Sequence, residues 1–260
     1  MGFSLPTLVV YPGRDLLSSR LEIKRDRVGL LAEISSEFVR RGINIFTTIA
    51  QVSPEGRGCV FIISECKGPE VLEDLRRSLE SIDGVGAVEM ERSEIRGLMI
   101  SGLFFPLSRA GRRIVLMVDS ALKSLIEELT RILGEDPANA IIFRVGYEMG
   151  KGLGRVHLEI GEAVGLRDPL EILKHVLLPL FKSSGYGIAS LEGIREGALR
   201  MVVRDSIEAR VRGRSERPSC FLVKGMLKGA LEEVLGRQVA MEESRCEAAG
   251  HDFCEFIASY

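Results

Sequence analysis

The chain of 260 residues predicts an α+β protein made of two domains. Apolar residues make up 45% of it, which is enough for two hydrophobic cores of ordinary size. In the first third of the chain, hydrophobic residues alternate between spacings typical of strands and of helices. The remainder combines long helical stretches with strand-like runs near the C-terminus. We therefore expect an N-terminal ferredoxin-like βαββαβ domain followed by a larger α+β domain.

The region from Ser19 to Ser93 predicts each element of the βαββαβ order. Gly42 is placed to end the first helix, and a turn at 54–56 is placed to join two strands as a hairpin. This split βαβ arrangement occurs in many proteins and does not identify a function. The expected elements are a strand at Leu21 and Ile23, a helix carrying Leu30, Ile34 and Phe38, strands over 43–52 and 59–66, a helix over 71–82 and a strand over 84–93.

The C-terminal region predicts strands at both ends and helices between them. Glycines at 146, 150, 152 and 154 lie in a helical stretch that lacks a nucleotide-binding fingerprint, so close helix packing explains them best. His157 and His175 lie in helices without a catalytic partner at motif spacing, which argues against an enzyme. The expected elements are strands over 98–105 and 112–118, helices capped by Asp119, Asp136 and Asp168, an end or kink at Pro179, strands over 187–213, a helix after Cys220, and a hairpin over 243–257.

Composition limits the classes of partner. The net charge is −2 and no Lys/Arg-rich run occurs, so direct nucleic-acid binding is not indicated. The first apolar run covers only residues 5–11, too short for a signal peptide or a membrane span, and we expect a soluble cytoplasmic protein. Arginine far outnumbers lysine, and Asn and Gln are almost absent, which favours a thermophilic source.

Four potential metal ligands occur near the C-terminus. Cys246, Cys254 and Glu243 lie in one short segment, and Cys220 lies 23 positions before Glu243. Thiolates and a carboxylate in a tetrahedral arrangement suit Zn²⁺, and Gly250 allows the connection between the last two cysteines to fold back. The sequence therefore predicts a structural zinc site.

Three alternatives remain open at this point. His251 could replace Glu243 as a ligand or support the ligands from behind. Cys246 and Cys254 could form a disulfide, and Cys220 could be an ordinary core residue at the start of an apolar helix. Cys59 and Cys66, at either end of a strand-like run, are expected to be small buried hydrophobic residues.

The spacing of Glu243, Cys246 and Cys254, with Cys220 opening an apolar helix, resembles the 4-vinyl reductase (4VR) domain. The resemblance covers about residues 98–260 and continues through the stretches 217–246 and 141–154. It implies the fold of the sensor domain of aromatic-responsive bacterial transcription activators. It also implies a structural zinc held by these four residues and an apolar pocket between helices and sheet.

The stretch from Leu21 to Ile45 resembles the opening of an ACT domain, and this likeness covers about residues 19–95. ACT modules bind amino acids or dimerise. The resemblance implies that the turn of Arg27, Val28, Gly29 and Leu30, together with Asn44, approaches a ligand. Gly29 permits close approach of the backbone, and the helix N-terminus offers free N–H groups to a carboxylate.

Together these features predict a ligand-sensing regulatory protein with an N-terminal extension over residues 1–18. We expect an ACT module that dimerises and binds an amino acid, and a 4VR-like domain that binds a small hydrophobic or aromatic molecule. The resemblance leaves two other functions open. One is an adaptor that uses the 4VR-like fold for assembly, as in subunits of vesicle-tethering complexes, and the other is an enzyme acting on an aromatic or tetrapyrrole substrate.

Overall fold

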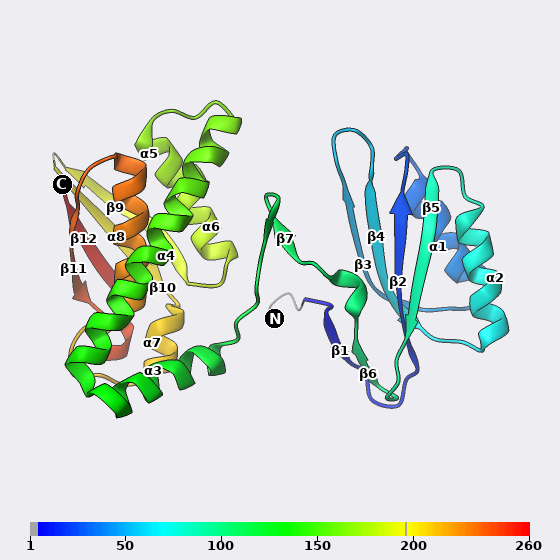
Figure 1. The fold of residues 1–260 in the computed structure, drawn as a ribbon, viewed down its shortest axis with the longest axis horizontal. Helices are drawn as coiled ribbons and strands as arrows, with labels where there is room; N and C mark the ends of the chain where they lie inside the picture. The colour runs from blue at the N-terminus through cyan, green and yellow to red at the C-terminus, as the bar shows by residue number, and fades with distance from the viewer. Residues whose placement is uncertain (1–4, 196) are drawn as a thin grey trace. The chain divides into compact units, whose positions relative to one another are not determined.

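The structure is a computed structural model, and it describes residues 5–195 and 197–260. Contacts between residues divide the chain into two compact units, Met1–Val115 and Leu116–Tyr260. The sequence-based boundary lies near residues 94–98, so residues 98–115 belong by contact to the unit that precedes that boundary. The two units are described separately below, and Figure 1 labels their elements.

The N-terminal unit contains the βαββαβ order over residues 16–92, flanked by short strands. The elements are β1 (Leu8–Val10), β2 (Leu16–Ile23), α1 (Leu30–Arg40), β3 (Ile45–Val52), β4 (Gly58–Glu65), α2 (Pro69–Glu80), β5 (Val85–Arg92), β6 (Leu98–Ile100), the 3₁₀ helix η1 (Gly102–Phe104), β7 (Ser108–Arg109) and β8 (Arg112–Arg113).

An antiparallel sheet with the order β3-β4-β2-β5 forms the centre of this unit. The amphipathic helices α1 and α2 bury their apolar faces against it (Figure 1). Leu21 of β2, Phe38 of α1 and Leu75 of α2 are completely buried in the core between these layers. Alternation of apolar residues along β2 therefore directs one of its faces toward the helices.

The opposite face of this sheet is covered in part by residues near both ends of the unit. β1 pairs with β6, and Met99 of β6 packs with Leu16 and Ile63 in a small second core. Phe104 of η1 stacks on Phe61 of β4 with ring centroids 4.6 Å apart. The segments before β2 and after β5 are thus packed parts of the N-terminal unit.

The C-terminal unit combines one antiparallel sheet with helices. Its elements are α3 (Asp119–Leu133), α4 (Glu135–Ala163), α5 (Pro169–Ile172), the π-helical segment η2 (Leu173–Leu177), α6 (Leu178–Ser183), β9 (Ile188–Arg195), β10 (Ala198–Arg204), α7 (Ile207–Arg212), α8 (Phe221–Leu235), β11 (Ala240–Arg245), the 3₁₀ helix η3 (Glu247–Ala249) and β12 (Cys254–Ser259).

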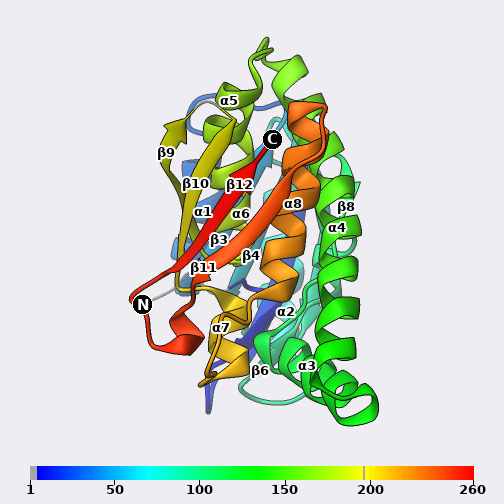
Figure 2. The ribbon, with the colours of Figure 1, turned by 90° about the vertical axis from the view of Figure 1, so that its left-hand side faces the viewer.

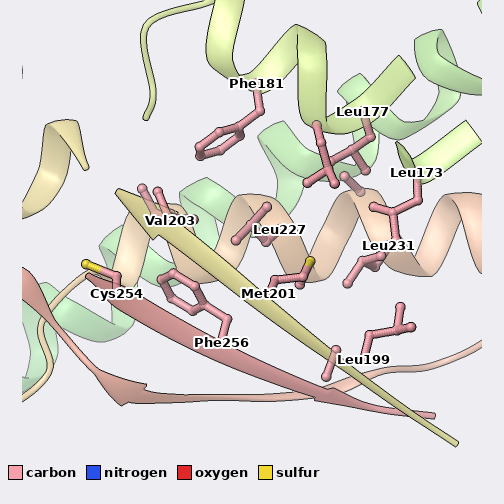
Figure 3. Close-up of a cluster of buried hydrophobic side chains, with 14 of the residues drawn as sticks. Leu173, Leu177, Phe181, Leu199, Met201, Val203, Leu227, Leu231, Cys254 and Phe256 are labelled. Carbon is pink, nitrogen blue, oxygen red and sulfur yellow. The ribbon is translucent and has the colours of Figure 1, made fainter. Parts of the chain in front are cut away.

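The sheet has the order β11-β12-β10-β9, and its inner face packs against α8 and the α5-η2-α6 segment (Figure 2). Figure 3 shows this core, in which Met201 and Phe256 from the strands meet Leu227 from α8 and Leu177 and Phe181 from the helical segment. Each of these five side chains is at most 7% exposed. The space between helices and sheet is thus occupied by the protein's own side chains.

Helices α4 and α8 lie side by side in close contact (Figure 2). A Cβ atom added at Gly150 of α4 would lie 2.1 Å from the carbonyl oxygen of Met226, and one at Gly229 of α8 would lie 2.1 Å from that of Tyr147. Gly146 and Gly154 face α8 in the same way, whereas Gly152 faces open space within the described part of the chain. Glycine is therefore needed at this crossing on both helices, as expected at three of the four positions on α4.

Three predicted elements differ from the structure. The run over 112–118 forms only the two-residue strand β8, and Val115 and Met117 are exposed. The predicted strand over 98–105 stops at Ile100, and residues 207–212 form helix α7 instead of a strand. Ser206 explains the helix, because its hydroxyl accepts a hydrogen bond from the amide of Ala209 and caps the first turn.

The predicted helix caps are correct in part. Asp168 caps α5 through a hydrogen bond from the amide of Leu170 at 2.9 Å. Asp119 is instead the first residue of α3, and Pro179 lies in the first turn of α6, directly after the π-helical segment. In the part of the chain that the structure describes, no helix combines the length and apolar character needed to cross a membrane.

Candidate functional site

The four predicted metal ligands meet where the N-terminus of α8 approaches the β11–β12 hairpin. Cys220 is the residue that precedes α8, and Glu243 lies in β11. Cys246 follows β11 directly, and Cys254 begins β12. Gly250, with φ of 89°, reverses the chain between the two cysteines, a backbone conformation that favours glycine. Elements distant in sequence are thereby brought to one point.

The distances between the sulfur atoms match those around a tetrahedral metal ion. The Sγ atom of Cys220 lies 3.6 Å from those of Cys246 and Cys254, and the latter two are 3.9 Å apart. Zinc–sulfur bonds of about 2.3 Å at tetrahedral angles would place sulfur atoms about 3.8 Å apart. The ligand atoms of all four residues lie within 4.8 Å of one another. This group of residues could hold a metal ion.

Glu243 has one carboxylate oxygen available for such an ion. Its Oε2 atom accepts a hydrogen bond from the backbone amide of Cys220 at 2.9 Å. Its Oε1 atom is buried and has no hydrogen-bond partner among the described residues. A buried carboxylate oxygen without a partner is costly, and coordination of a cation would remove that cost.

Burial and crowding shift the acidities of these groups in different directions. Burial raises the pKa of Glu243 to about 8, and the nearby Cys246 adds to that shift. The pKa of Cys220 is raised well above its ordinary value, first by contact with Cys246 and Cys254 and then by burial. The pKa of Cys246 is lowered by its contacts with the same two neighbouring thiols. Without a cation, the protein therefore favours ionisation of Cys246 over that of Cys220.

Two polar residues that the sequence analysis did not single out surround the sulfur atoms. The backbone amide of Glu247 points at the Cys254 sulfur from 3.3 Å, and the Ser206 hydroxyl lies 3.6 Å from the Cys220 sulfur. The Glu247 carboxylate accepts hydrogen bonds from the amides of Asp205 and Ser206 at 2.7 and 2.9 Å. Only the position of Glu247, directly after Cys246, could have suggested its role from sequence.

The structure separates the alternatives for this site. His251 is exposed, and its Nδ1 atom lies 3.3 Å from the nitrogen and 3.1 Å from the oxygen of the Cys246 backbone. It is not one of the four clustered residues. Cys246 and Cys254 do not form a disulfide, because a separation of 3.9 Å far exceeds the S–S bond length of about 2.05 Å. Cys59 and Cys66 are half-buried and free.

The predicted ligand-binding turn in the N-terminal unit is only partly assembled. Gly29, with φ of 89°, precedes α1, and Val28 is fully exposed. Leu30 is buried in the core, and the Arg27 guanidinium is bound to Glu33 at 2.6 and 2.7 Å. The turn therefore offers backbone amides, while the Arg27 side chain already has a carboxylate partner.

Asn44 lies at the other end of the sheet from this turn. Its carbonyl oxygen accepts a hydrogen bond from Glu65, which pairs with Leu16 at the start of β2, whereas Arg27 follows the end of β2 at Ile23. Seven residue steps of a strand span about 23 Å. Within one copy of the unit, Asn44 and the turn therefore cannot contact the same small ligand.

The C-terminal unit has two cavities outside its packed core. One of about 980 Å³ lies between α3 and the connection from α7 to α8, and one of about 510 Å³ lies beside the loop that carries Glu247. The apolar pocket expected between helices and sheet coincides with the side chains of Figure 3 instead.

Two family models match this part of the chain. Residues 199–259 match the model of the vinyl-4-reductase (4VR) domain, and this range contains all four clustered residues and most of the sheet. Residues 107–161 match the model described as activator of aromatic catabolism, which covers α3 and most of α4. The predicted 4VR character of the C-terminal region is thus confirmed for residues 199–259.

Known proteins show similarity over about half of the chain. The uncharacterised protein MJ0150 of Methanocaldococcus jannaschii is 25% identical over 118 residues, which are 45% of this chain and 62% of that protein. The phenol-responsive sensory domain of the transcription activator PoxR is 20% identical, with a TM-score of 0.52, over 57% of this chain and 77% of that domain. The PoxR domain therefore shares the fold.

The ACT domain of the GTP pyrophosphokinase of Chlorobium tepidum is 22% identical over 30% of this chain and 99% of that domain. Its TM-score is 0.26. A likeness at this TM-score carries no argument about the N-terminal unit.

Proposed function

We propose that this chain is a regulatory protein that senses a small molecule through its C-terminal unit. The carrying observation is the combination, in one unit, of a 4VR match, a match to the model for activators of aromatic catabolism, and the fold of a phenol-responsive sensory domain. Such a domain acts by binding its ligand with different affinities in two conformations. The ligand class is a small hydrophobic or aromatic molecule.

We further propose that zinc holds the N-terminus of α8 to the β11–β12 hairpin through Cys220, Glu243, Cys246 and Cys254. Three sulfur atoms at thiolate spacing and one unpartnered carboxylate oxygen support this assignment. All three thiols are completely buried, and no catalytic group that we identified adjoins them. A closed site of four protein ligands is structural, since a catalytic zinc keeps a position open for water or substrate.

The N-terminal unit is proposed to be an ACT-like module that pairs with a second copy of the chain. Its antiparallel order β3-β4-β2-β5 with two helices on one face supports this proposal. β3 lies at an edge of the sheet, where unpaired backbone groups allow pairing with another chain. Pairing of two copies would also offer a way to bring Asn44 of one copy toward the Arg27–Leu30 turn of the other, to form an amino-acid site.

A thermal-shift screen of the metal-loaded protein against phenols, aromatic acids and the twenty amino acids tests the sensory role. A ligand at about one hundred times its dissociation constant adds roughly 2.7 kcal/mol to the stability of the folded state. We expect a dose-dependent rise in the melting temperature for one aromatic class. The effect should persist when residues 27–30 are replaced and should disappear when the C-terminal unit cannot fold.

The screen has two contrary outcomes. A shift with amino acids only would assign sensing to the N-terminal unit and overturn the proposal for the C-terminal unit. No shift with any compound, combined with stable retention of a protein partner in a pull-down, would favour an assembly role. Turnover of an aromatic substrate would show an enzyme instead.

A further inference from the structure

The larger cavity of the C-terminal unit is a cleft with an unusual number of arginines. Its volume is about 980 Å³, within the range of small-molecule sites. One wall consists of Ile126, Thr130 and their neighbours on α3, and the other is the connection over residues 211–219 that leads from α7 to α8. Four arginines and three glutamates line it, which leaves one positive charge in excess.

Arg212 is held in a fixed position at the back of this cleft. Its Nε atom donates to Glu208 at 3.0 Å, and Glu208 is completely buried and also accepts the amide of Val223 at 2.9 Å. The Arg212 guanidinium lies 5.5 Å from the centre of the Phe221 ring. Its Nη2 atom is buried and lies 3.0 Å from the same Glu208 oxygen, yet makes no hydrogen bond within the described chain. The guanidinium therefore has a donor that its surroundings leave unsatisfied.

Ser219 and Arg214 provide further unused donors in the same cleft. Ser219 is 6% exposed, and its hydroxyl is buried without a hydrogen-bond partner among the described residues. Arg214 is exposed, and in the described part of the chain no acceptor pairs with it. By contrast, Arg131 is bound to Glu128 and Arg217 to Glu135 and Asp136. A buried polar atom without a partner in a cleft indicates a missing ligand atom.

We propose that this cleft binds a small organic carboxylate. Arg212 and Arg214 would donate to its two oxygens, with the Ser219 hydroxyl as an additional donor. The hydrocarbon part would lie toward the apolar floor that Ile126 and Val211 form. The proposal rests on the proposed function, because it names the chemical class and the place of the sensed molecule.

The charges of the cleft favour a carboxylate over a phosphate. Guanidinium groups match the planar, paired oxygens of a carboxylate. Glu127, Glu135 and Glu216 at the same cleft would repel a dianion, whereas a single excess positive charge balances a monoanion. A carboxylate alone would fill a small part of 980 Å³, so the cleft has room for a ring or a short chain beyond it.

Titration of the full-length, metal-loaded protein with benzoate tests this inference, with methyl-labelled isoleucine and valine as NMR reporters. We expect saturable shifts of the Ile126 and Val211 methyl signals. Benzamide, which has the shape of benzoate without its charge, should bind at least tenfold more weakly. Phenylacetate and hexanoate extend the titration to a longer acid and to one without a ring.

Variants locate the carboxylate. Arg214→Gln should weaken benzoate binding at least tenfold, and Ser219→Ala should weaken it severalfold with unchanged metal content. Arg210→Gln is the matched control, because Arg210 is exposed on α7, pairs with Asp205 and does not line the cleft. It should alter the affinity by less than twofold.

The outcomes separate this inference from the proposed function. If none of the three acids binds, or if Arg214→Gln binds benzoate as the parent does, the carboxylate site is wrong. Binding of phenol without any acid would overturn the site and leave the sensory function standing. Failure of both acids and neutral aromatic compounds to bind would overturn the two together.

Discussion

At the scale of residues, the three cysteines of the C-terminal unit differ from ordinary buried thiols. Each sulfur lies within 4 Å of the other two, and the pKa values of Cys220 and Cys246 move in opposite directions. A divalent cation would stabilise all three thiolates together and release their protons. The chemistry of the donors, and not their burial alone, therefore indicates a metal ligand set.

Replacement of Cys246 by serine tests this ligand set. We expect metal content, measured by mass spectrometry of the purified protein, to fall from one zinc per chain to near zero. The free energy of unfolding should fall by about 3 kcal/mol or more, which for a unit of this size lowers the melting temperature by about 10 °C. Cys59→Ser is the control and should keep the metal. Full zinc occupancy in the Cys246 variant would refute the assignment.

His157 should make stability depend on pH. It is buried on α4, its Nδ1 atom has no partner among the described residues, and burial lowers its pKa to about 4. As the pH falls below the ordinary histidine value of about 6.5, the unfolded chain takes up the proton first. Stability is therefore complete above pH 6.5 and decreases toward pH 4, by roughly 3 kcal/mol from this residue.

His157→Leu should remove this contribution. Urea unfolding of the parent and the variant between pH 4 and 7 should give a smaller loss of stability in the variant, so that the two diverge as the pH falls. Other groups, including the metal ligands, titrate equally in both proteins and cancel in the comparison. Parallel curves would mean that His157 is not buried in its neutral form.

At the scale of elements, the crossing of α4 and α8 depends on glycine at defined positions. Backbone atoms of each helix occupy the space that a side chain on the other would need. Because interiors are close-packed, even one added methyl group must displace a helix. The sequence indicated the crossing through its glycine-rich stretch, but it could not tell which glycines face α8.

Two alanine substitutions on α4 distinguish these positions. Gly150→Ala would place a Cβ atom 2.1 Å from a carbonyl oxygen of α8 and should lower the free energy of unfolding by about 3 kcal/mol. Gly152→Ala would meet nothing within 4 Å among the described residues and should raise it by about 0.5–1 kcal/mol, since alanine favours helix. Thermal unfolding measures both. Equal effects at the two positions would contradict the described crossing.

Errors at the scale of elements have a common physical cause. The apolar run over 112–118 is typical of a strand, yet only β8 pairs, because a strand needs a partner that the local sequence does not supply. Residues 207–212 lie in a strand-like context, and the Ser206 cap makes them helical. Pairing and capping are decided by neighbours, so periodicity alone misassigned both segments.

At the scale of the whole molecule, the two compact units have separate cores and the metal ligands belong to one of them. Removal of zinc should therefore destabilise residues 116–260 selectively. Hydrogen exchange of the full chain, read by mass spectrometry with and without a chelator, should show faster exchange in α8, β11 and β12. Exchange in β2 and β4 should be unchanged. Equal acceleration in both units would show that the N-terminal unit depends on the metal as well.

The sequence by itself determined the α+β class, the order of elements from β2 to β5, and the four clustered metal ligands. Each depends on local information: hydrophobic periodicity, terminating glycines, and a spacing of Glu and Cys in one hairpin with Cys220 opening a helix. These signals survive without knowledge of which segments pack together.

Only the tertiary structure decided where distant segments meet. It separated Asn44 from the turn at Arg27 by the length of β2, filled the expected apolar pocket with core side chains, and brought Arg212, Arg214 and Ser219 into one cleft with α3. These relations arise from packing between elements that are far apart in sequence, and periodicity reports only which face of an element is apolar, not what covers it.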